Sequence, residues 1–148
     1  MMAAPSPPDF DPDQLIAFMV SHGHNGQLGV QPGAYGDDWA ELALPYDERF
    51  IGDPATGIIA SGPILAMMDM AVSLGIWLKA GQFRPQATLD LRVDYLRPAK
   101  PGRTIVGRGE CYRITRSVAF VRGQAHDGDP ANPIAHVAGT YMFTDTPA

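Results

Sequence analysis

The stretch GIIASGPILAMMDMAVSLG, residues 57–75, contains most of the longest apolar run of this chain. Between residues 63 and 78 the only clearly polar side chains are the carboxylate of Asp69 and the hydroxyl of Ser73. Removing an unpaired carboxylate from water costs several kcal/mol or raises its pKa. We therefore expect Asp69 to have a function that justifies its place in an apolar segment.

The same stretch predicts a long helix that is buried on every side. Ser61 is a suitable N-cap, Pro63 fits the first turn, and Gly81 ends the helix after residues 79–80. Apolar residues occur all around this helix, which is typical of a helix without a solvent face. A small domain rarely supplies so much cover, so we expect a sheet wrapped around the helix and a second subunit against it.

The flanking segments predict a short N-terminal helix and a mostly antiparallel sheet. Asp11 is an N-cap candidate, Pro12 suits the first helical position, and Gly23 ends the helix. Strands are expected at residues 27–35, 38–46, 86–98, 103–115, 117–127 and 134–145. Alternation in the third of them puts Leu89 on one face and Thr88 on the other. Runs of strands around one central helix indicate an α+β fold.

Length and composition indicate one soluble domain. The chain has 148 residues, of which 45% are hydrophobic and 18% charged. We expect a flexible Pro-rich N-terminus over residues 1–10 and a single domain over residues 11–148. The start has neither the basic residues nor the apolar core of a signal peptide. The apolar run 63–78 is interrupted by Asp69 and is shorter than the roughly 20 residues of a membrane span, so no membrane partner is expected.

Charge and cysteine content exclude several other classes of protein. The net charge of −5 argues against nucleic-acid binding, which needs a basic surface. The single cysteine, Cys111, allows no internal disulfide and fits a reducing cytoplasm. His22 and His24 have no further cysteine or histidine nearby, so no metal site is expected.

Four motifs resemble one protein family. Gly57 is followed by Ala60-Ser61-Gly62 and then by Asp69, nine residues after Ala60. ATLDLRVDYLRPAKPG at 87–102, RITRSVAFVRGQAHDGD at 113–129 and IAHVAGTYMF at 134–143 continue the pattern. Over residues 26–143 the chain resembles the hotdog-fold acyl-CoA thioesterases of the phenylacetate-pathway and hydroxybenzoyl-CoA type. It departs from their pattern at Ala60, where the family has histidine.

The resemblance implies a fold and a mechanism. The fold would be an antiparallel sheet of about five to six strands wrapped around the long helix. Asp69 would act as general base or nucleophile on an acyl-CoA thioester, and the N–H groups of Ser61 and Gly62 would form the oxyanion site. Water would be positioned by Ser73, four residues after Asp69 on the same helix face, or by Thr88. The subunits would form an obligate homodimer with antiparallel helices, and a dimer of such dimers.

The resemblance also implies where coenzyme A would bind. Candidates for its phosphates are Arg97, Lys100, Arg103 and Arg116. Candidates for the acyl pocket are Phe50, Ile64, Met67 and Met68, which would suit an aliphatic chain and are equally suited to a core. The only cofactor group would be the coenzyme A of the substrate.

Two other functions remain open. A non-catalytic hotdog protein that binds acyl-CoA or a related ligand is favoured by Ala60, whereas Asp69 in register favours the enzyme. A hotdog dehydratase would need an Asp/His pair, and the sequence offers none near Asp69. Release of free thiol from acyl-CoA esters would distinguish the enzyme from the non-catalytic binding protein.

Overall fold

The apolar stretch around Asp69 forms helix α3, Ser61–Ala80, in the computed structural model, which describes residues 10–145. Ala60 is extended and is the N-cap, so Ser61 is the first helical residue and not the predicted cap. Gly81 ends the helix in the left-handed region at φ 65°, and its N–H donates to the Leu78 carbonyl at 3.1 Å. That stop is the predicted one, and glycine adopts this φ at no steric cost.

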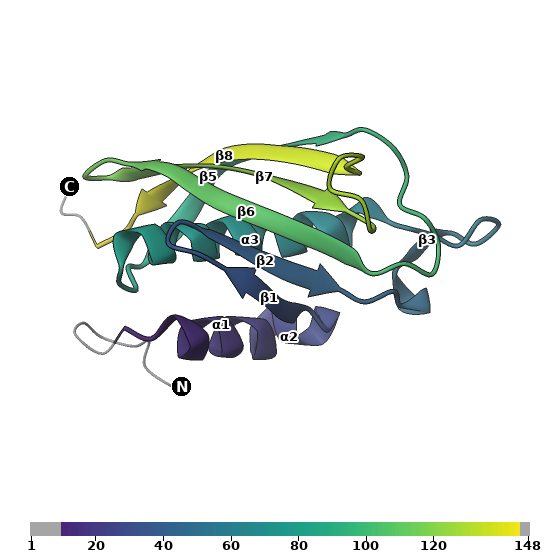
Figure 1. The fold of residues 1–148 in the computed structure, drawn as a ribbon, viewed down its shortest axis with the longest axis horizontal. Coiled ribbons are helices and arrows are strands. Elements are labelled where there is room, and N and C mark those ends of the chain that lie inside the picture. The colour runs from purple at the N-terminus through teal and green to yellow at the C-terminus, as the bar shows by residue number, and fades with distance from the viewer. Residues whose placement is uncertain (1–9, 146–148) are drawn as a thin grey trace.

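A six-stranded antiparallel sheet covers one side of α3 (Figure 1). Its strands follow the order β1-β2-β6-β7-β8-β5. Their bounds are β1 Gln31–Tyr35, β2 Trp39–Leu44, β5 Gln86–Tyr95, β6 Ile105–Ile114, β7 Val118–His126 and β8 Ala135–Phe143. This architecture confirms the predicted α+β hotdog fold with a short N-terminal helix.

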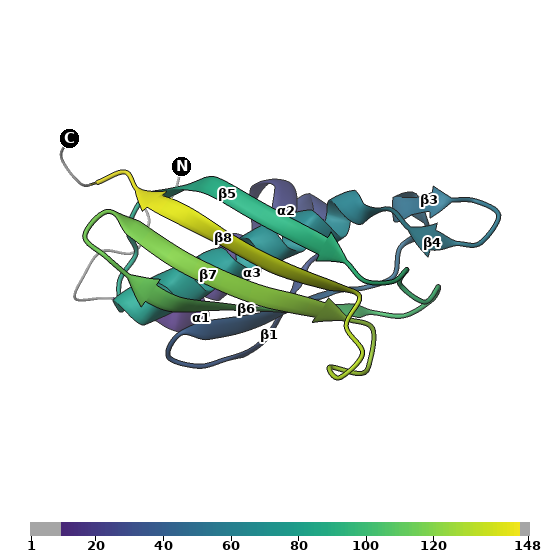
Figure 2. The same cartoon turned by 90° about the horizontal axis from the view of Figure 1, so that it is seen from above.

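The remaining elements complete the two ends of the molecule. They are α1 Pro12–Ser21, α2 Gly23–Leu28, a 3₁₀ turn Glu48–Phe50, β3 Ile51–Asp53 and β4 Ile58–Ile59. The helices α1 and α2 pack on the flank of α3, and β3 and β4 form a small separate hairpin beyond one end of the main sheet (Figure 2). Helix α1 is confirmed, but residues 27–28, expected in a strand, belong to α2, and no strand was expected over residues 51–59.

Close approach of α3 to the sheet depends on small residues in β6. A Cβ atom added at Gly109 would collide with the backbone of Ala71 and Val72. At Gly107 it would lie 2.9 Å from the Met67 Cε atom. The helix therefore packs directly on β6, with β2 and β7 on either side. Residues 71–78 of the helix are all buried, as predicted, whereas its first half has an exposed side in the single chain, where Leu65 is 38% exposed.

The last strand of the sheet, β5, is mostly exposed, as is β1 at the opposite edge. Its pairing with β8 is irregular: Thr88 is opposite Tyr141, but Asp90 is opposite Thr140, so Leu89 is an extra residue. Such a β-bulge changes the direction in which side chains point and is frequent beside functional sites. The bulge places Thr88 and Leu91 on the side of the sheet that faces α3, so the strict alternation predicted for this strand is wrong.

The predicted flexible segment 1–10 lies outside the described residues except for Phe10, which packs partly buried against the core.

Among the described helices, only α3 is long and apolar enough to cross a membrane by length and composition. Since 61% of its most apolar window is buried inside the protein, these properties also fit a core helix.

Candidate active site

Asp69 lies on the face of α3 that the sheet leaves open. Gly62, Leu65, Ala66 and Asp69 follow the spacing i, i+3, i+4, i+7, which puts them on one side of a helix. Together with Thr88 and Leu91 they line a pocket of about 340 Å³. Asp69 is half-buried there, so the carboxylate that seemed isolated among apolar residues borders an open cavity.

Two hydroxyl groups hold the Asp69 carboxylate through a single oxygen. The Thr88 hydroxyl donates to Oδ1 at 3.1 Å, and the Tyr141 hydroxyl also donates to Oδ1. Within residues 10–145, no hydrogen bond to Oδ2 is found. The carboxylate is thus fixed in orientation while one of its oxygens keeps its lone pairs available.

The sheet register explains why these two hydroxyls meet at Asp69. Thr88 on β5 and Tyr141 on β8 are direct partners in the ladder. Side chains of directly opposed residues lie about 5 Å apart on the same face of a sheet. The bulge at Leu89 follows immediately after Thr88. Thr88 therefore stays paired with Tyr141, and only the residues after Leu89 exchange the faces on which their side chains lie. The predicted site residue Thr88 therefore does contact Asp69.

Tyr141 is the site residue that the sequence analysis missed. Its side chain is almost fully buried, with 2% of its surface exposed. Burial raises the pKa of the Tyr141 phenol above its usual range, and the Asp69 carboxylate raises it further. The phenol consequently remains protonated and acts as a donor. A signal was present in the sequence: Tyr141 is a hydroxyl at an inward position of a strand whose other inward residues, such as Val137 and Phe143, are apolar.

The Ser73 hydroxyl contacts the backbone of Asp69 and not its carboxylate. Its hydroxyl donates to the backbone carbonyl of Asp69 at 2.7 Å, four residues earlier in the helix. Ser73 is buried, with 7% of its surface exposed, and does not line the pocket. A serine inside a helix commonly satisfies its hydroxyl in this way. Ser73 therefore stabilises the helix turn behind Asp69, and its hydrogen bond goes neither to the carboxylate nor into the cavity.

The N-terminus of α3 offers N–H groups at the end of the same pocket. Ala60 has no side-chain oxygen that could cap the helix, and Ser61 and Gly62 are exposed. The Tyr95 hydroxyl donates to the Ser61 carbonyl at 3.2 Å and so connects the end of β5 to this turn. The first N–H groups of a helix lack intrahelical partners and carry a partial positive charge, so they attract a developing anion.

The residues proposed for the acyl pocket lie elsewhere. Ile64, Met67 and Met68 are buried in the core against the sheet, on the opposite side of α3 from Asp69. Phe50 is partly buried against that core and does not line the pocket. An apolar helix pattern without a polar stripe does not indicate which face meets the sheet. The apolar lining beside Asp69 consists instead of Leu65, Ala66 and Leu91.

Of the four basic residues proposed for coenzyme A, Arg97 has a structural role. Its guanidinium donates to both carboxylate oxygens of Asp127, at 3.0 and 2.7 Å, and to the Asn132 carbonyl at 2.7 Å. The Lys100 N–H donates to the same carboxylate at 2.7 Å. The Arg97 guanidinium holds the pKa of the buried Asp127 carboxyl well below its usual range. This network fixes the loop between β5 and β6.

The other three basic residues occupy two ends of the molecule. Lys100 and Arg103 are exposed on the loop after β5, at the end where the Tyr95 hydroxyl meets the start of α3. Arg116 is exposed in the turn between β6 and β7, at the opposite end of the sheet (Figure 2). A single chain therefore brings Lys100 and Arg103, but not Arg116, toward the end of the pocket at the N-terminus of α3.

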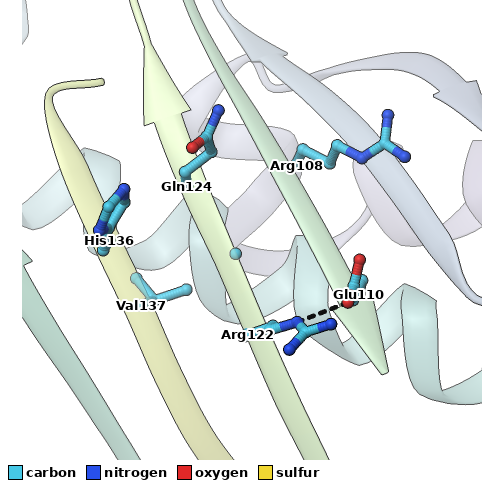
Figure 3. Close-up of a pocket in the computed structure, with 7 residues that line it drawn as sticks. Arg108, Glu110, Arg122, Gln124, His136 and Val137 are labelled. Carbon is cyan, nitrogen blue, oxygen red and sulfur yellow. Dashed lines mark hydrogen bonds and ion pairs between the residues drawn. The ribbon is translucent and has the colours of Figure 1, made fainter. Parts of the chain in front are cut away.

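A second pocket lies on the outer face of the sheet. It has about 440 Å³ and is lined by polar side chains of β6, β7 and β8, including Arg108, Glu110, Arg122, Gln124 and His136 (Figure 3). Arg122 is paired with Glu110 at 2.6 Å, and Arg108 stacks on Trp39. The glycines that alternate with these residues face α3, so the outer pocket is separated from Asp69 by the sheet. It contains none of the donors or the carboxylate of the inner pocket.

Neither pocket contains a set of metal ligands. No group of three or more histidine, cysteine, aspartate or glutamate side chains suited to a metal ion occurs in the described part of the chain. Cys111 is buried beneath the sheet, and burial raises the pKa of its thiol. The inner pocket therefore offers a carboxylate, two hydroxyls and the helix N-terminus as its chemical groups.

Comparisons with known proteins find related sequences and structures. A family model described as thioesterase superfamily matches residues 56–134, more than half of the chain. The medium/long-chain acyl-CoA thioesterase YigI of Escherichia coli is 28% identical over 131 residues, which cover 80% of this chain and 83% of that protein. A crystal structure of a Pseudomonas aeruginosa protein is 37% identical with a TM-score of 0.78, covering 88% of this chain and 96% of that one. The Haemophilus influenzae thioesterase HI1161 shares the fold, with a TM-score of 0.77 at 20% identity over 93% of this chain and 92% of that one.

Proposed function

Because the chain belongs to the thioesterase superfamily, we propose that it hydrolyses an acyl-CoA thioester at the pocket beside Asp69. The observation that carries the proposal is the carboxylate held through Oδ1 by Thr88 and Tyr141, with Oδ2 available at an apolar cavity. A carboxylate in this state can act as a general base or as a nucleophile. The reaction consumes one water and releases a free acid and coenzyme A, with no further cofactor.

The mechanism follows from the groups at the two ends of the pocket. Oδ2 either takes a proton from a water that attacks the carbonyl carbon, or attacks that carbon itself to give an anhydride that water then cleaves. In both cases the carbonyl electrons move to oxygen, where the N–H groups of Ser61 and Gly62 stabilise the negative charge. The C–S bond then breaks, and the coenzyme A thiolate leaves and takes up a proton.

The apolar lining indicates the class of acyl group. Leu65, Ala66 and Leu91 offer aliphatic surface next to Asp69, and none of them provides a hydrogen bond. Such a surface favours an alkyl chain over a polar acyl group. Since YigI is a medium/long-chain acyl-CoA thioesterase, we propose fatty acyl-CoA esters of that length range as the first substrates to test.

Helix geometry favours a site shared between two subunits. Gly62 and Asp69 are seven residues apart, which corresponds to about 10 Å along a helix axis. One thioester carbonyl must receive the attacking oxygen and the oxyanion donors within about 3 Å each. A second copy with its helix antiparallel would bring the donors of one chain to the Asp69 of the other.

The surface around the pocket supports this homodimer. The last strand of the sheet, β5, has an unpaired edge within the described chain. Leu89 and Leu96 are 56% and 54% exposed at this strand, and Leu65 of α3 is 38% exposed beside it. Exposed apolar side chains gathered along a free strand edge are typical of a surface that another chain covers. A dimer of such dimers is proposed only on the family resemblance.

Lys100 and Arg103 are the proposed contacts for the coenzyme A phosphates. Both are exposed near the N-terminus of α3, where the thioester would lie. Arg116 would reach the same ligand only from another subunit, and Arg97 is occupied by Asp127. The cytoplasm is the proposed compartment, because a thiol such as Cys111 and a coenzyme A substrate both fit a reducing environment.

The test is thiol release from short, medium, long and aromatic acyl-CoA esters by the wild type and by Asp69→Asn. Turnover by the wild type that disappears in the variant supports the proposal. A folded protein that binds these esters without releasing thiol would instead be the acyl-CoA-binding protein that Ala60, in place of the family histidine, favours.

A mixed-subunit experiment tests the shared site. Gly62→Pro removes one N–H donor, and Asp69→Asn removes the carboxylate, so each variant alone should be inactive. When the two are refolded together, half of the dimers are mixed and each has one intact site, which restores about a quarter of the sites. No recovery in a mixture shown to contain mixed dimers would place both groups within one chain.

A further inference from the structure

We infer that Tyr141 is a positioning residue that determines which oxygen of Asp69 faces the substrate. The inference rests on the proposed thioesterase function, and it assigns a role to a strand residue outside the motifs that resemble the family's catalytic helix. Its basis is that the Tyr141 hydroxyl contacts two oxygen atoms of Asp69, one in the carboxylate and one in the backbone. The hydroxyl donates to Oδ1 and also lies 3.3 Å from the backbone carbonyl of Asp69.

Tyr141 and Thr88 differ in how firmly each is held. Thr88 is exposed on the edge strand β5, whereas Tyr141 is buried on β8, which has β7 on one side and β5 on the other. A buried phenol on an inner strand has little rotational freedom. The strand of Thr88 is paired on one side only, whereas the strand of Tyr141 is paired on both, so more neighbours hold Tyr141 in place. Tyr141 is therefore the fixed reference for the carboxylate.

The two hydrogen bonds to Oδ1 also determine which oxygen of the Asp69 carboxylate stays free. A carboxylate can rotate about its Cβ–Cγ bond and exchange its two oxygens. Two donors on Oδ1 stabilise one of these orientations, because hydrogen bonds to a charged acceptor are stronger than neutral ones. Oδ2 is then the oxygen that meets water or the thioester. Preorganisation of this kind reduces the reorientation needed in the transition state.

Protonation of Tyr141 supports the assignment. The pKa of its phenol is raised by burial and by Asp69, so it keeps its proton over the working range of pH. It can donate to the carboxylate but does not serve as the base. Oδ1 of Asp69 thus receives its hydrogen bonds within the protein, while Oδ2 stays available to the pocket.

The test compares Tyr141→Phe with a matched variant, Tyr35→Phe. The Tyr35 hydroxyl also donates to an aspartate, Asp13 Oδ1 at 2.8 Å, but on α1 and β1, away from the pocket. Both variants lose one hydroxyl that bonds a carboxylate. We expect Tyr141→Phe to lower kcat about 10- to 100-fold with KM changed by less than about twofold, and Tyr35→Phe to leave both unchanged.

A pH–rate profile separates positioning from loss of structure. Without the Tyr141 donor, the ionised carboxylate has one stabilising hydrogen bond fewer, so the acidic limb of the kcat profile should move to higher pH. A variant that is merely less stable would lose activity without this shift. Unchanged kcat and an unchanged profile in folded Tyr141→Phe would overturn the inference, while thiol release by the wild type would still uphold the proposed function.

A spectroscopic measurement covers the case in which Tyr141→Phe does not fold. Ultraviolet difference spectra of wild type and Asp69→Asn at neutral pH report on the surroundings of the tyrosine rings without any turnover. Removal of the negative charge beside the Tyr141 hydroxyl should shift the absorption of one tyrosine. Identical tyrosine spectra would overturn the contact. Absence of turnover in the wild type would overturn the proposed function and the role in it, whatever the spectra show.

Discussion

The two faces of α3 have almost the same hydrophobicity and opposite roles. On one face Ile64, Met67 and Met68 pack beneath the sheet and belong to the core. On the other, Leu65 and Asp69 border a cavity that only the edge strand β5 approaches. What separates core from site is the number of strands that cover each face. A helix without a polar stripe can therefore support a stable core on one face and border an apolar pocket on the other.

The largest expected effect is on the open face. Asp69→Asn should reduce kcat by about 10² to 10⁴, the range that a general base contributes. Asparagine Oδ1 can still accept from Thr88 and Tyr141, so the free energy of unfolding should change little. Thiol-release kinetics and chemical denaturation measure the two quantities. A large loss of stability with activity retained would reverse the assignment of the two faces.

A substitution on the α3 face that packs against the sheet should lower stability and leave activity unchanged. Met68 is fully buried, and Met68→Ala should lower the free energy of unfolding by about 2 to 5 kcal/mol through lost contacts and a cavity. Activity per folded molecule should stay near that of the wild type at a temperature where the variant is folded. A selective rise in KM for long acyl chains would show that the cavity beside Met68 holds substrate after all.

The Arg97–Asp127 ion pair lies outside both faces of α3 and gives a control in which stability depends on pH. The pKa of Asp127 is lowered by Arg97, so this pair stabilises the folded state at neutral pH, and its contribution is lost progressively as the pH falls below about 5. Asp127→Asn should lower the free energy of unfolding by about 3 kcal/mol at pH 7. The difference between variant and wild type should shrink in acid. Denaturation curves at several pH values would reveal a constant difference if the pair were not ionised.

A smaller effect is expected for the apolar part of the open face. Leu65→Ala should raise KM for long-chain substrates a few-fold, since about 1 to 3 kcal/mol is available from the methylenes that it contacts. Leu65→Met, which keeps the volume, is the matched control. If Leu65 packs mainly against a second subunit, light scattering will show weaker dimers in place of a change in KM.

The smallest effect should come from the hydroxyl behind Asp69. Ser73→Ala removes the hydrogen bond to the Asp69 carbonyl and should cost about 1 kcal/mol of stability at most. Its kcat should remain within about twofold of the wild-type value. A fall in kcat comparable to that of Asp69→Asn would restore the alternative in which Ser73 positions water.

Local patterns were sufficient to predict the scaffold. The extent of α3 and its Gly81 stop are short-range properties, and the structure confirms them except that the helix begins at Ser61 and is capped by Ala60. The register of Asp69 with the family motif stays a prediction. Thr88 was predicted as a site residue from the resemblance, and its contact with Asp69 is observed. The other predicted roles in catalysis and coenzyme A binding stay predictions.

What could not be predicted depends on pairing between distant residues. Tyr141 reaches Asp69 only because β8 pairs with β5 in one register. The bulge at Leu89 changes the phase of β5, and nothing in the strict alternation of that segment announces it. Met67 and Met68 were assigned to the pocket because an apolar pattern all around a helix carries no information about direction.

The origin of the Asp69 contacts also has a consequence for biosynthesis. The carboxylate is on α3, but its two donors are 19 and 72 residues later in the chain. A nascent chain that has released only α3 and β5 into solution therefore lacks the Tyr141 anchor. Bringing together residues that are 72 positions apart costs more chain entropy than bringing together near neighbours. The carboxylate therefore has both of its donors only after the last strand, β8, has paired with β5.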